Sequence, residues 1–492
     1  MKKVIIIGSG FSGISAAAFM AKSGWDVTVL EKHSMPGGRA RQFKEAGFTF
    51  DMGPSWYWMP GVFEQFFGSF GKKVSDYYNL KRLDPSYTVY WEKEVLPLPA
   101  SFEKLSDVFE RKETGSKNKL IAFLKEAQYK YEIGINKLVR KPGLSIKEFI
   151  DSSVIMGVFK LDVFNSIKKH VGKFFKNKQL RQLLEFPVLF LGALPADTPA
   201  LYSLMNYADI KLGTWYPEGG MYEIVKGMYE VATEQGAEFK FNQNVTGFKF
   251  INNRISSVIV KNEAEELHFD ADIIIGAADY QFIETKLLPK VFRSYSDKYW
   301  NSRKLAPSCL LYFIGVGKKL KTVYHHSLFF DVDFEKHADE IYKKPQWPSN
   351  PLFYVSATSV SDESVAPEGC ENLFFLIPVA AGLDGDNKEL RLKYFDIIVD
   401  RFEKRIGETI RESIIYHKNF GPSDFVNDYN AFKGNAYGLA NTLMQTAILK
   451  PRCKSKKVDN LYFTGQLTVP GPGVPPCIIS GEVVSNEVIR DH

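Results

Sequence analysis

The chain has 492 residues, of which 45% are hydrophobic and 24% are charged, and its formal net charge is +6. This composition is typical of a folded protein that is long enough for two or three domains. The positive excess is too small to indicate nucleic-acid binding, and because no nucleic-acid-binding motif is present we expect no nucleic-acid partner. No apolar run reaches the roughly 20 residues that span a bilayer, and the first is too short for a signal peptide, so we expect a cytoplasmic protein.

The four cysteines and eight histidines limit the chemistry further. The cysteines are far apart and lack C-x-x-C spacing, and the histidines show no H-x-x-x-H pair. Neither pattern resembles a disulfide framework or a metal site. We therefore expect buried thiols and no metal ion.

A glycine-rich stretch near the N-terminus gives the first functional prediction. The β-branched run at 4–7 predicts a strand buried on both faces, and Gly8, Gly10 and Gly13 follow with G-x-G-x-x-G spacing. Gly8 permits a tight turn, Gly10 lets a pyrophosphate approach the backbone, and Gly13 lets the next helix pack against the sheet. The free N–H groups at the start of that helix would face the phosphates.

A second strand completes the unit. The helix is expected to end at Gly24, and the run at 27–30 predicts a strand that closes on Glu31. Glu31 lies 18 residues after Gly13, where a carboxylate can accept hydrogen bonds from ribose hydroxyls. The whole arrangement favours a dinucleotide site over a glycine-rich turn without a ligand. Three neighbours are assigned to the same site: Phe11, Ser12 and Lys32.

The segment 36–60 continues the pattern. Gly38 and Arg39 lie in a flexible turn, and the guanidinium of Arg39 can pair with a phosphate. Gly53 and Pro54 predict a further turn close to the ligand. Three aromatic residues follow and suit either an apolar ligand or an ordinary core, namely Trp56, Tyr57 and Trp58.

With this segment a family becomes recognisable. Residues 1–60 resemble the FAD-containing amine oxidase and phytoene desaturase superfamily, which couples G-x-G-x-x-G to a downstream G-G-R, and GFTFDMGPSW (47–56) is similar to the bacterial carotenoid desaturases. The resemblance implies FAD, with its pyrophosphate on the first helix, its adenosine ribose on the acid after the second strand, and the G-G-R segment alongside. The positions that carry these roles are Gly8, Gly10, Gly13, Glu31, Gly38 and Arg39.

The implied fold is α/β, with a Rossmann-like FAD-binding domain interleaved with an α+β substrate domain and a helical subdomain able to contact a membrane. We expect the FAD-binding domain to comprise 1–75, 211–300 and 436–492. Strand-like runs at 87–91, 309–315, 352–357 and 372–378 and a helix at 388–406 are assigned to the substrate-binding domain, 76–114 and 301–435. The remaining residues, 115–210, form the helical membrane-associating subdomain.

Within that subdomain, residues 164–192 mix lysines with apolar residues that recur at every third and fourth position, as an amphipathic helix requires. A basic amphipathic helix with aromatic residues can lie in a membrane interface. The alternative is a core-packed helix with a solvated basic face, and the pattern by itself favours this second interpretation. A substrate dissolved in the membrane would reverse the preference.

The middle of the chain returns to the FAD domain. The segment WYPEGG (215–220) is similar to a Y-P-x-G-G loop of the family and precedes a helix expected at 221–235. ADIIIGAAD (271–279) predicts a strand that enters a loop, but its G-A-A lacks dinucleotide spacing, so no separate NAD(P) domain is expected. Val245 is assigned to the cofactor site, together with Ser55 from the earlier turn.

The last landmark is NLYFTGQLTVPGPGVPPCIISG at 460–481, which predicts a buried strand at 461–464 and a helix from Val474 onward. A similar motif closes the carotenoid desaturases, usually with a His before the first Pro-Gly, where this chain has Val469. Many flavoproteins have an Asp where this chain has Gln466. The residues assigned to the cofactor here are Gly465, Gln466, Gly473, Val474 and Pro475.

The resemblance implies desaturation of a carotenoid. FAD can accept a hydride from an allylic carbon, and loss of a proton from the adjacent carbon completes the double bond. The polyene needs an apolar tunnel that excludes water, for which the candidates are Trp56, Tyr57, Trp58 and Trp215. A carboxylate near the flavin can take the proton, and the candidates are Asp51 and Glu218.

The expected partners are a carotenoid substrate, the inner face of the cell membrane, with which the protein would associate peripherally, and quinone or oxygen as electron acceptor. Two substrates stay open: phytoene, or a later 1′-hydroxylated or γ-carotene-type carotenoid desaturated at the 3,4 position. The rival functions are another amine oxidase-like FAD oxidoreductase and a non-redox carotenoid isomerase or carotenoid-binding protein.

Overall fold

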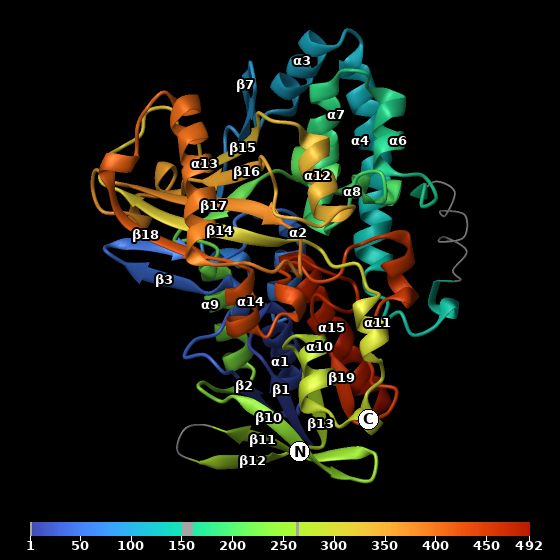
Figure 1. Ribbon diagram of the computed structural model, residues 1–492. Coiled ribbons are helices and arrows are strands. Elements are labelled where there is room, and N and C mark those ends of the chain that lie inside the picture. Colours follow the sequence, from blue (N-terminus) through green and yellow to red (C-terminus); the bar gives the residue numbers. More distant parts are fainter. Residues whose placement is uncertain (1, 150–160, 262–264) are drawn as a thin grey trace.

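The computed structural model describes residues 2–149, 161–261 and 265–492. Figure 1 shows a lower body around one sheet, an upper body around a larger sheet, and a group of helices beside the upper body. Both chain ends lie at the bottom of the lower body, and the Lys2 ammonium donates a 2.7 Å hydrogen bond to the carbonyl of His492. Residues 150–160, part of the predicted helical subdomain, lie outside the described ranges.

The lower body is built on a five-stranded parallel sheet with the order β19-β13-β1-β2-β9. Its central strand, β1, is apolar on both faces, as a parallel strand covered from both sides must be. Its strands come from all three segments assigned to the FAD-binding domain: β1 (Lys3–Ile7), β2 (Asp26–Leu30), β9 (Glu238–Lys240), β13 (Ile273–Gly276) and β19 (Leu461–Phe463).

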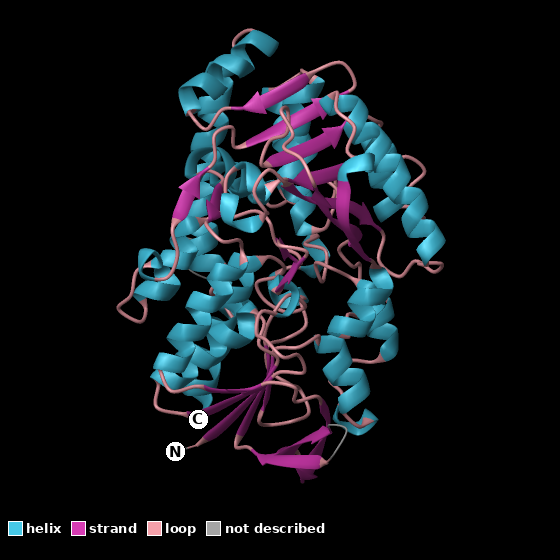
Figure 2. Cartoon of the chain, turned by 90° about the vertical axis from the view of Figure 1, so that its left-hand side faces the viewer, coloured by secondary structure: helices cyan, strands magenta, loops and turns pink. Residues whose placement is uncertain are grey.

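Helices cover one face of this sheet and an antiparallel layer lies at the other (Figure 2). Val4 and Ile6 pack into a core with the helices α1 (Phe11–Lys22), α2 (Pro60–Gly68), α9 (Tyr222–Glu234) and α15 (Val474–Asp491). Ile5 and Ile7 pack into a second core with the antiparallel strands β10 (Val245–Ile251), β11 (Arg254–Lys261) and β12 (Glu266–Asp270). The alternation of side chains along β1 therefore fills both cores.

The upper body is built on a seven-stranded mixed sheet with the order β18-β14-β17-β16-β15-β6-β7. Leu310 and Tyr312 on one face pack under the long helix α13 (Lys388–Ile406), whereas Leu311 and Phe313 on the other face join a core with the helical group. The strands come from the segments assigned to the substrate domain: β6 (Tyr87–Trp91), β7 (Val95–Leu98), β14 (Ser308–Val316), β15 (His326–Phe330), β16 (Phe353–Ser356), β17 (Glu371–Val379) and β18 (Ile414–Phe420).

The remaining elements join the two bodies or surround them. Two short pairings, β3 (Gln42–Glu45) with β4 (Phe48–Asp51) and β5 (Leu80–Arg82) with β8 (Trp215–Pro217), link the sheets. The other helices are α3 (Phe102–Lys112), α4 (Ser116–Ile133), α6 (Ile167–Phe174), α7 (Lys178–Glu185), α8 (Leu204–Tyr207), α10 (Tyr280–Phe282), α11 (Asp297–Asn301), α12 (Phe334–Tyr342) and α14 (Pro422–Tyr429). Within the described ranges, none is both long and apolar enough to cross a membrane.

The prediction of one continuous amphipathic helix at 164–192 is wrong about continuity. The segment forms two helices, α6 and α7, followed by a 3₁₀ turn at Phe186–Leu191. The break lies at Phe175, whose backbone is extended. Asn177 then starts α7, since its side chain accepts hydrogen bonds from the backbone N–H groups of Gln179 and Leu180.

Candidate active site

The carboxyl ends of the parallel strands meet at one edge of the five-stranded sheet, which is where ligands bind in such folds. Gly8 follows β1 there with φ of +101°, and its N–H donates to the carbonyl of Leu30 at the end of β2. A Cβ on Gly13 would lie 2.0 Å from the Gly8 carbonyl oxygen, so only glycine lets α1 start this close to the turn. A Cβ on Gly10, in contrast, would meet no protein atom within 4 Å.

Gly8 and Gly10 line a cavity at this edge of the sheet, and Glu31, at the end of β2, lines it as well. Its carboxylate is buried and accepts hydrogen bonds from the Ser9 backbone N–H at 2.9 Å, the Ser9 hydroxyl at 2.7 Å and the His33 backbone N–H at 2.9 Å. These three bonds fix the carboxylate against the glycine turn. A carboxylate has about four acceptor positions, so capacity for a further donor such as a ribose hydroxyl remains.

Arg39 supplies a buried positive charge to this cavity. The guanidinium lies 5.3 Å from the ring centre of Tyr429 and is 3.4 Å from the carbonyl of Asn435, and its Nε atom has no hydrogen-bond partner among the described atoms. Burial lowers its pKa, and the nearby carboxylate of Asp279 opposes that effect. A buried guanidinium with a spare donor suits an electron-rich ligand group.

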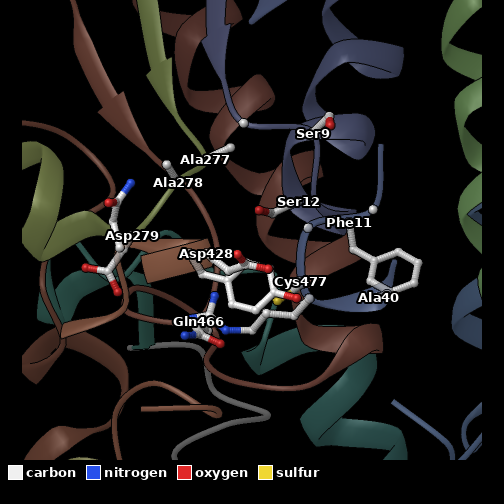
Figure 3. A pocket seen from close by; sticks show the side chains of 18 of the residues that line it. Ser9, Phe11, Ser12, Ala40, Ala277, Ala278, Asp279, Asp428, Gln466 and Cys477 are labelled. Carbon is white, nitrogen blue, oxygen red and sulfur yellow. The ribbon is translucent and has the colours of Figure 1, made fainter. Parts of the chain in front are cut away.

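The closing motif forms the far end of the cavity. Gly465 follows β19, and Gln466 donates a 3.1 Å hydrogen bond to the side-chain oxygen of Asn435. Helix α15 begins at Val474, and the preceding Gly473 provides no side-chain cap, so the N-terminal dipole of the helix faces the cavity that Gly473 and Val474 line. Figure 3 shows Ser12, Gln466 and Cys477 around the same space.

A second cavity, of about 260 Å³ beside the first of about 270 Å³, lies between the seven-stranded sheet and the helical group. No Asp, Glu, Lys or Arg is among the described residues that line it. Its walls are mainly aromatic and aliphatic, among them Trp56, Trp58, Phe186 and Phe330. We call the first the dinucleotide cavity and the second the apolar cavity.

The two cavities share part of their walls, contributed by Gly53, Pro54, Leu376, Tyr437, Gly473 and Val474. His337 is the one imidazole among the described residues of the apolar lining, and burial lowers its pKa to about 4. Its Nε2 donates to the carbonyl of Pro378 at 3.0 Å, while Nδ1 accepts from the backbone N–H of Leu352 at 3.0 Å. The ring is therefore neutral and fully engaged at neutral pH.

Most residues assigned to the cofactor from the sequence line the dinucleotide cavity: Gly8, Gly10, Phe11, Ser12, Glu31, Lys32, Gly38, Arg39, Gly53, Pro54, Val245, Gly465, Gln466, Gly473 and Val474. Ser55 and Pro475 line the apolar cavity instead. Gly13 lines neither and acts through the packing of α1 against the turn.

The four aromatic candidates divide in the same way. Trp56 and Trp58 line the apolar cavity, whereas Tyr57 and Trp215 line neither cavity. Tyr57 is buried in the core of the lower body, where its ring stacks on Phe63 at 4.2 Å. Trp215 lies beneath the Arg82 guanidinium at 5.3 Å. Neither of these two can touch a ligand held in the cavities.

The two carboxylates suggested as proton acceptors lie outside both cavities, and this geometry argues against that role. Asp51 accepts hydrogen bonds from the backbone N–H groups of Met221 and Tyr222 at 2.6 and 3.2 Å, so it caps the start of α9. Burial raises the pKa of Asp51 to about 6. Glu218 is exposed to solvent.

Several lining residues escaped the sequence analysis, notably Ser9, His33, Ala277, Ala278, Asp279, Tyr429 and Tyr437. Figure 3 shows Ala277, Ala278 and Asp279 on the side of the cavity that faces Ser9. The parallel pairing of β13 with β1 places them there, because Ala277 follows β13 just as Gly8 follows β1. The sequence does contain a signal for them: the apolar run before G-A-A predicts a strand, and pairing that strand with the first one would have placed the residues after it at the cavity.

The donor set fits a dinucleotide. Gly10 leaves space for a pyrophosphate at the start of α1, and Glu31 stands at the ribose position. The buried Arg39 has an Nε atom without a partner in the described part of the chain. The N-terminus of α15 stands at the other end, next to the apolar cavity. A ligand along this path would have its reactive end at the wall that the two cavities share.

Comparison with known proteins agrees with this geometry. The model of the family described as flavin containing amine oxidoreductase matches residues 11–489. Carotenoid 3,4-desaturase of Haloarcula japonica is 39% identical over 99% of this chain and 98% of its own. The zeta-carotene-forming phytoene desaturase of Myxococcus xanthus is 28% identical over 99% of this chain and 94% of its own.

Solved structures show the same fold at low identity. An oxidoreductase from Methanosarcina mazei superposes with a TM-score of 0.63 at 14% identity, over 98% of this chain and 100% of its own. A putrescine oxidase variant redesigned for cofactor binding superposes with a TM-score of 0.61 at 13% identity, over 100% of this chain and 99% of its own. The family match, the relatives and the dinucleotide cavity together show that the chain belongs to the flavin containing amine oxidoreductase family and is an FAD-dependent oxidoreductase.

Proposed function

We propose that the protein is a carotenoid desaturase, which removes a hydride and a proton from adjacent carbons of a polyene and leaves a new double bond. The observation that carries the proposal is the shared wall between the dinucleotide cavity and the apolar cavity. Bound FAD accepts a hydride, and this wall would hold the substrate carbon beside it. The names of the relatives, carotenoid 3,4-desaturase and phytoene desaturase, support a carotenoid substrate.

The lining of the apolar cavity supports a hydrocarbon over an amine. An ammonium group loses its hydration on entering such a space, and that loss costs several kcal/mol unless a carboxylate or an aromatic cage replaces water. Among the described residues no carboxylate lines the cavity. Trp56, which lines the cavity, is stacked face to face on His326 at 4.3 Å, so one face of its indole is already covered. The chain's own residues thus exclude water and orient an apolar chain.

The position of desaturation is a finer part of the proposal. Identity to the carotenoid 3,4-desaturase is 39%, against 28% and 29% for relatives named as phytoene and 4,4'-diapophytoene desaturases. This difference favours a later carotenoid, desaturated at the 3,4 position, over phytoene. The proposal further includes peripheral association with the inner face of the cell membrane, where carotenoids dissolve, and quinone or oxygen as the electron acceptor.

The described residues of the apolar cavity wall include no carboxylate that could take the proton. His337 has both ring nitrogens engaged, so it offers no free acceptor. The hydroxyl groups among the described residues of the apolar lining belong to Ser55, Tyr342, Tyr354 and Tyr437. Tyr437 is the hydroxyl on the wall shared with the dinucleotide cavity, but burial raises its pKa well above the usual range, so it stays a neutral phenol and is not the base. The proposal places the departing proton on the dinucleotide side, where bound FAD would take it up together with the hydride.

The test uses the FAD-loaded protein with phytoene or a 1′-hydroxylated γ-carotene-type substrate in liposomes without oxygen. Bleaching of the flavin with a red-shifted carotenoid product supports desaturation, and the substrate that reacts shows the step in the series. A shifted spectrum with oxidised flavin would indicate isomerisation. Bleaching by amines alone would replace the proposal with amine oxidation.

A further inference from the structure

A short surface segment between β18 and β19 exposes apolar side chains. Of the fifteen large hydrophobic side chains exposed in the described part of the chain, four lie within 443–449, and their exposed fractions run from 37% to 70%. They are Leu443, Met444, Ile448 and Leu449. The two 3₁₀ turns of this segment, at Leu443–Gln445 and Ala447–Leu449, hold these side chains outward together.

The four apolar side chains line a surface hollow, and basic side chains line it with them. Lys304, Arg452 and Lys456 are exposed and Arg303 is half-buried, whereas Asp197 is the one carboxylate among the described residues that line it. An excess of cations over anions around an apolar tip is complementary to a negatively charged surface. It is less suited to a neutral protein groove, which would leave the cations without partners.

Two tyrosines hold part of this basic rim in place. Tyr295 and Tyr299 stack at 4.3 Å, the Lys456 ammonium lies 4.2 Å from the ring centre of Tyr295, and the Arg303 guanidinium lies 4.4 Å from that of Tyr299. Aromatic and cationic side chains around an apolar tip are the combination found at the level of lipid headgroups.

We propose that this surface, the apolar tip Leu443, Met444, Ile448 and Leu449 with the basic rim Arg303, Lys304, Arg452 and Lys456, docks onto a bilayer of anionic phospholipid. The tip enters the headgroup region and the rim contacts lipid phosphates. Figure 1 shows this orange-red segment on the right-hand side of the molecule just above α11, on the side away from α13.

The docking surface adjoins the apolar cavity through the backbone. The Asn441 N–H donates to the carbonyl of Leu191, which lines that cavity, and the Thr446 hydroxyl lies 3.3 Å from that of Tyr202. Docking would therefore place the 3₁₀ turn at Phe186–Leu191, which contributes Phe186, Leu189 and Leu191 to the cavity wall, close to the bilayer. This consequence for substrate entry rests on the proposed function. Lipid binding at this surface specifies the peripheral membrane association that the proposed function includes, but it does not depend on the desaturation reaction.

The predicted basic stretch at 164–192 is a weaker candidate for the membrane contact. Lys168 pairs with Glu335 at 2.7 Å and Arg181 lies 3.6 Å from Glu185, so part of its charge is neutralised within the protein. Phe175, one of its aromatic residues, is buried in the core of the upper body.

The test measures cosedimentation of the FAD-loaded protein with vesicles of phosphatidylglycerol and phosphatidylcholine, and with phosphatidylcholine alone. We expect binding to the anionic vesicles only. Each cation contributes about fivefold to binding, so K304E/R452E should weaken it at least 20-fold. M444S/I448S should weaken it about tenfold, because serine cannot enter the apolar part of the interface.

The matched control is K393E/K404E, which reverses two exposed lysines on α13 without touching the docking surface. Flavin content and the apparent melting temperature establish that each variant is folded. Equal vesicle binding by all variants, no binding of anionic vesicles by the wild type, or loss in the control alone would overturn the proposal. Flavin bleaching by a carotenoid in detergent micelles, which needs no docking, tests the proposed function separately.

Discussion

Substitutions of Gly10 and Gly13 should have opposite effects on FAD affinity and on stability of the apoprotein, although both glycines belong to the same motif. A Cβ at Gly10 meets nothing within 4 Å and the residue has φ of −73°, so Gly10→Val should leave the apoprotein nearly as stable as the wild type. The valine side chain would occupy the space for the pyrophosphate. Overpacking of this kind costs about 3 kcal/mol, which corresponds to about a 150-fold loss of FAD affinity.

Gly13→Ala should do the reverse. Its Cβ would lie 2.0 Å from the carbonyl oxygen of Gly8 and 3.1 Å from the Cβ of Ala277, so α1 must move away from the sheet even without cofactor. We expect a cost at the upper end of the range of about 1–3 kcal/mol and a lower apparent melting temperature of the apoprotein.

The assay is thermal unfolding of the two apoproteins with and without added FAD. FAD at about 100 times its wild-type dissociation constant should stabilise the wild type by about 2.7 kcal/mol, and the same FAD concentration should stabilise Gly10→Val by only about 0.3 kcal/mol. The reasoning is refuted if Gly10→Val destabilises the apoprotein as much as Gly13→Ala does, or if it retains normal flavin.

Three further predictions follow from the two cavities. Glu31→Gln replaces an acceptor of three hydrogen bonds by a side chain whose amide opposes the donors, so retained FAD should fall about 10- to 100-fold, measured by flavin released on denaturation. Leu189→Lys places an ammonium in the apolar cavity and should lower kcat/KM for the carotenoid at least 100-fold while flavin content stays normal. The lowered pKa of His337 means that its neutral form is favoured in the folded state, so stability is full above the unfolded pKa near 6.5 and falls below it. With a folded pKa of about 4, the loss between pH 8 and pH 5 is about 2 kcal/mol, and denaturant titrations should show a shallower fall in His337→Gln.

The Glu31 and Leu189 predictions each have a matched control variant, and the His337 prediction has an outcome that would contradict it. Glu234→Gln changes a surface carboxylate of α9 and should retain flavin. Leu392→Lys changes an exposed leucine on α13 and should leave turnover unchanged. Equal pH profiles for the wild type and His337→Gln would contradict the assignment of that part of the slope to this imidazole.

The dinucleotide cavity could be predicted from the sequence because its chemistry is local. The turn, the helix start and the acid of the second strand lie within residues 8–31, and each has a residue type that the geometry requires. Arg39 and the closing motif could be added by resemblance. Asp279 and Tyr429 could not, because they reach the cavity only through the parallel pairing of β13 and the fold of the upper body.

The aromatic run 56–58 alternates between two sides of the chain, and this alternation can be recognised in the sequence. Successive residues of an extended segment point to opposite sides, so Trp56 and Trp58 reach the apolar cavity while Tyr57 faces the other core. Alternation alone could have separated Tyr57 from its neighbours. Which of the two sides is the cavity depends on the seven-stranded sheet, and no short motif encodes that.

The order of strands in the five-stranded sheet has a consequence for synthesis of the protein. The glycine turn is translated early, but β19 and α15, which complete the opposite side of the cavity, come at the far end of the sequence. Domains that fold during translation do so from the N-terminus, yet this one must wait for its last strand. The cavity can therefore enclose FAD only after β19 and α15 have been translated and have packed beside β13 and α1.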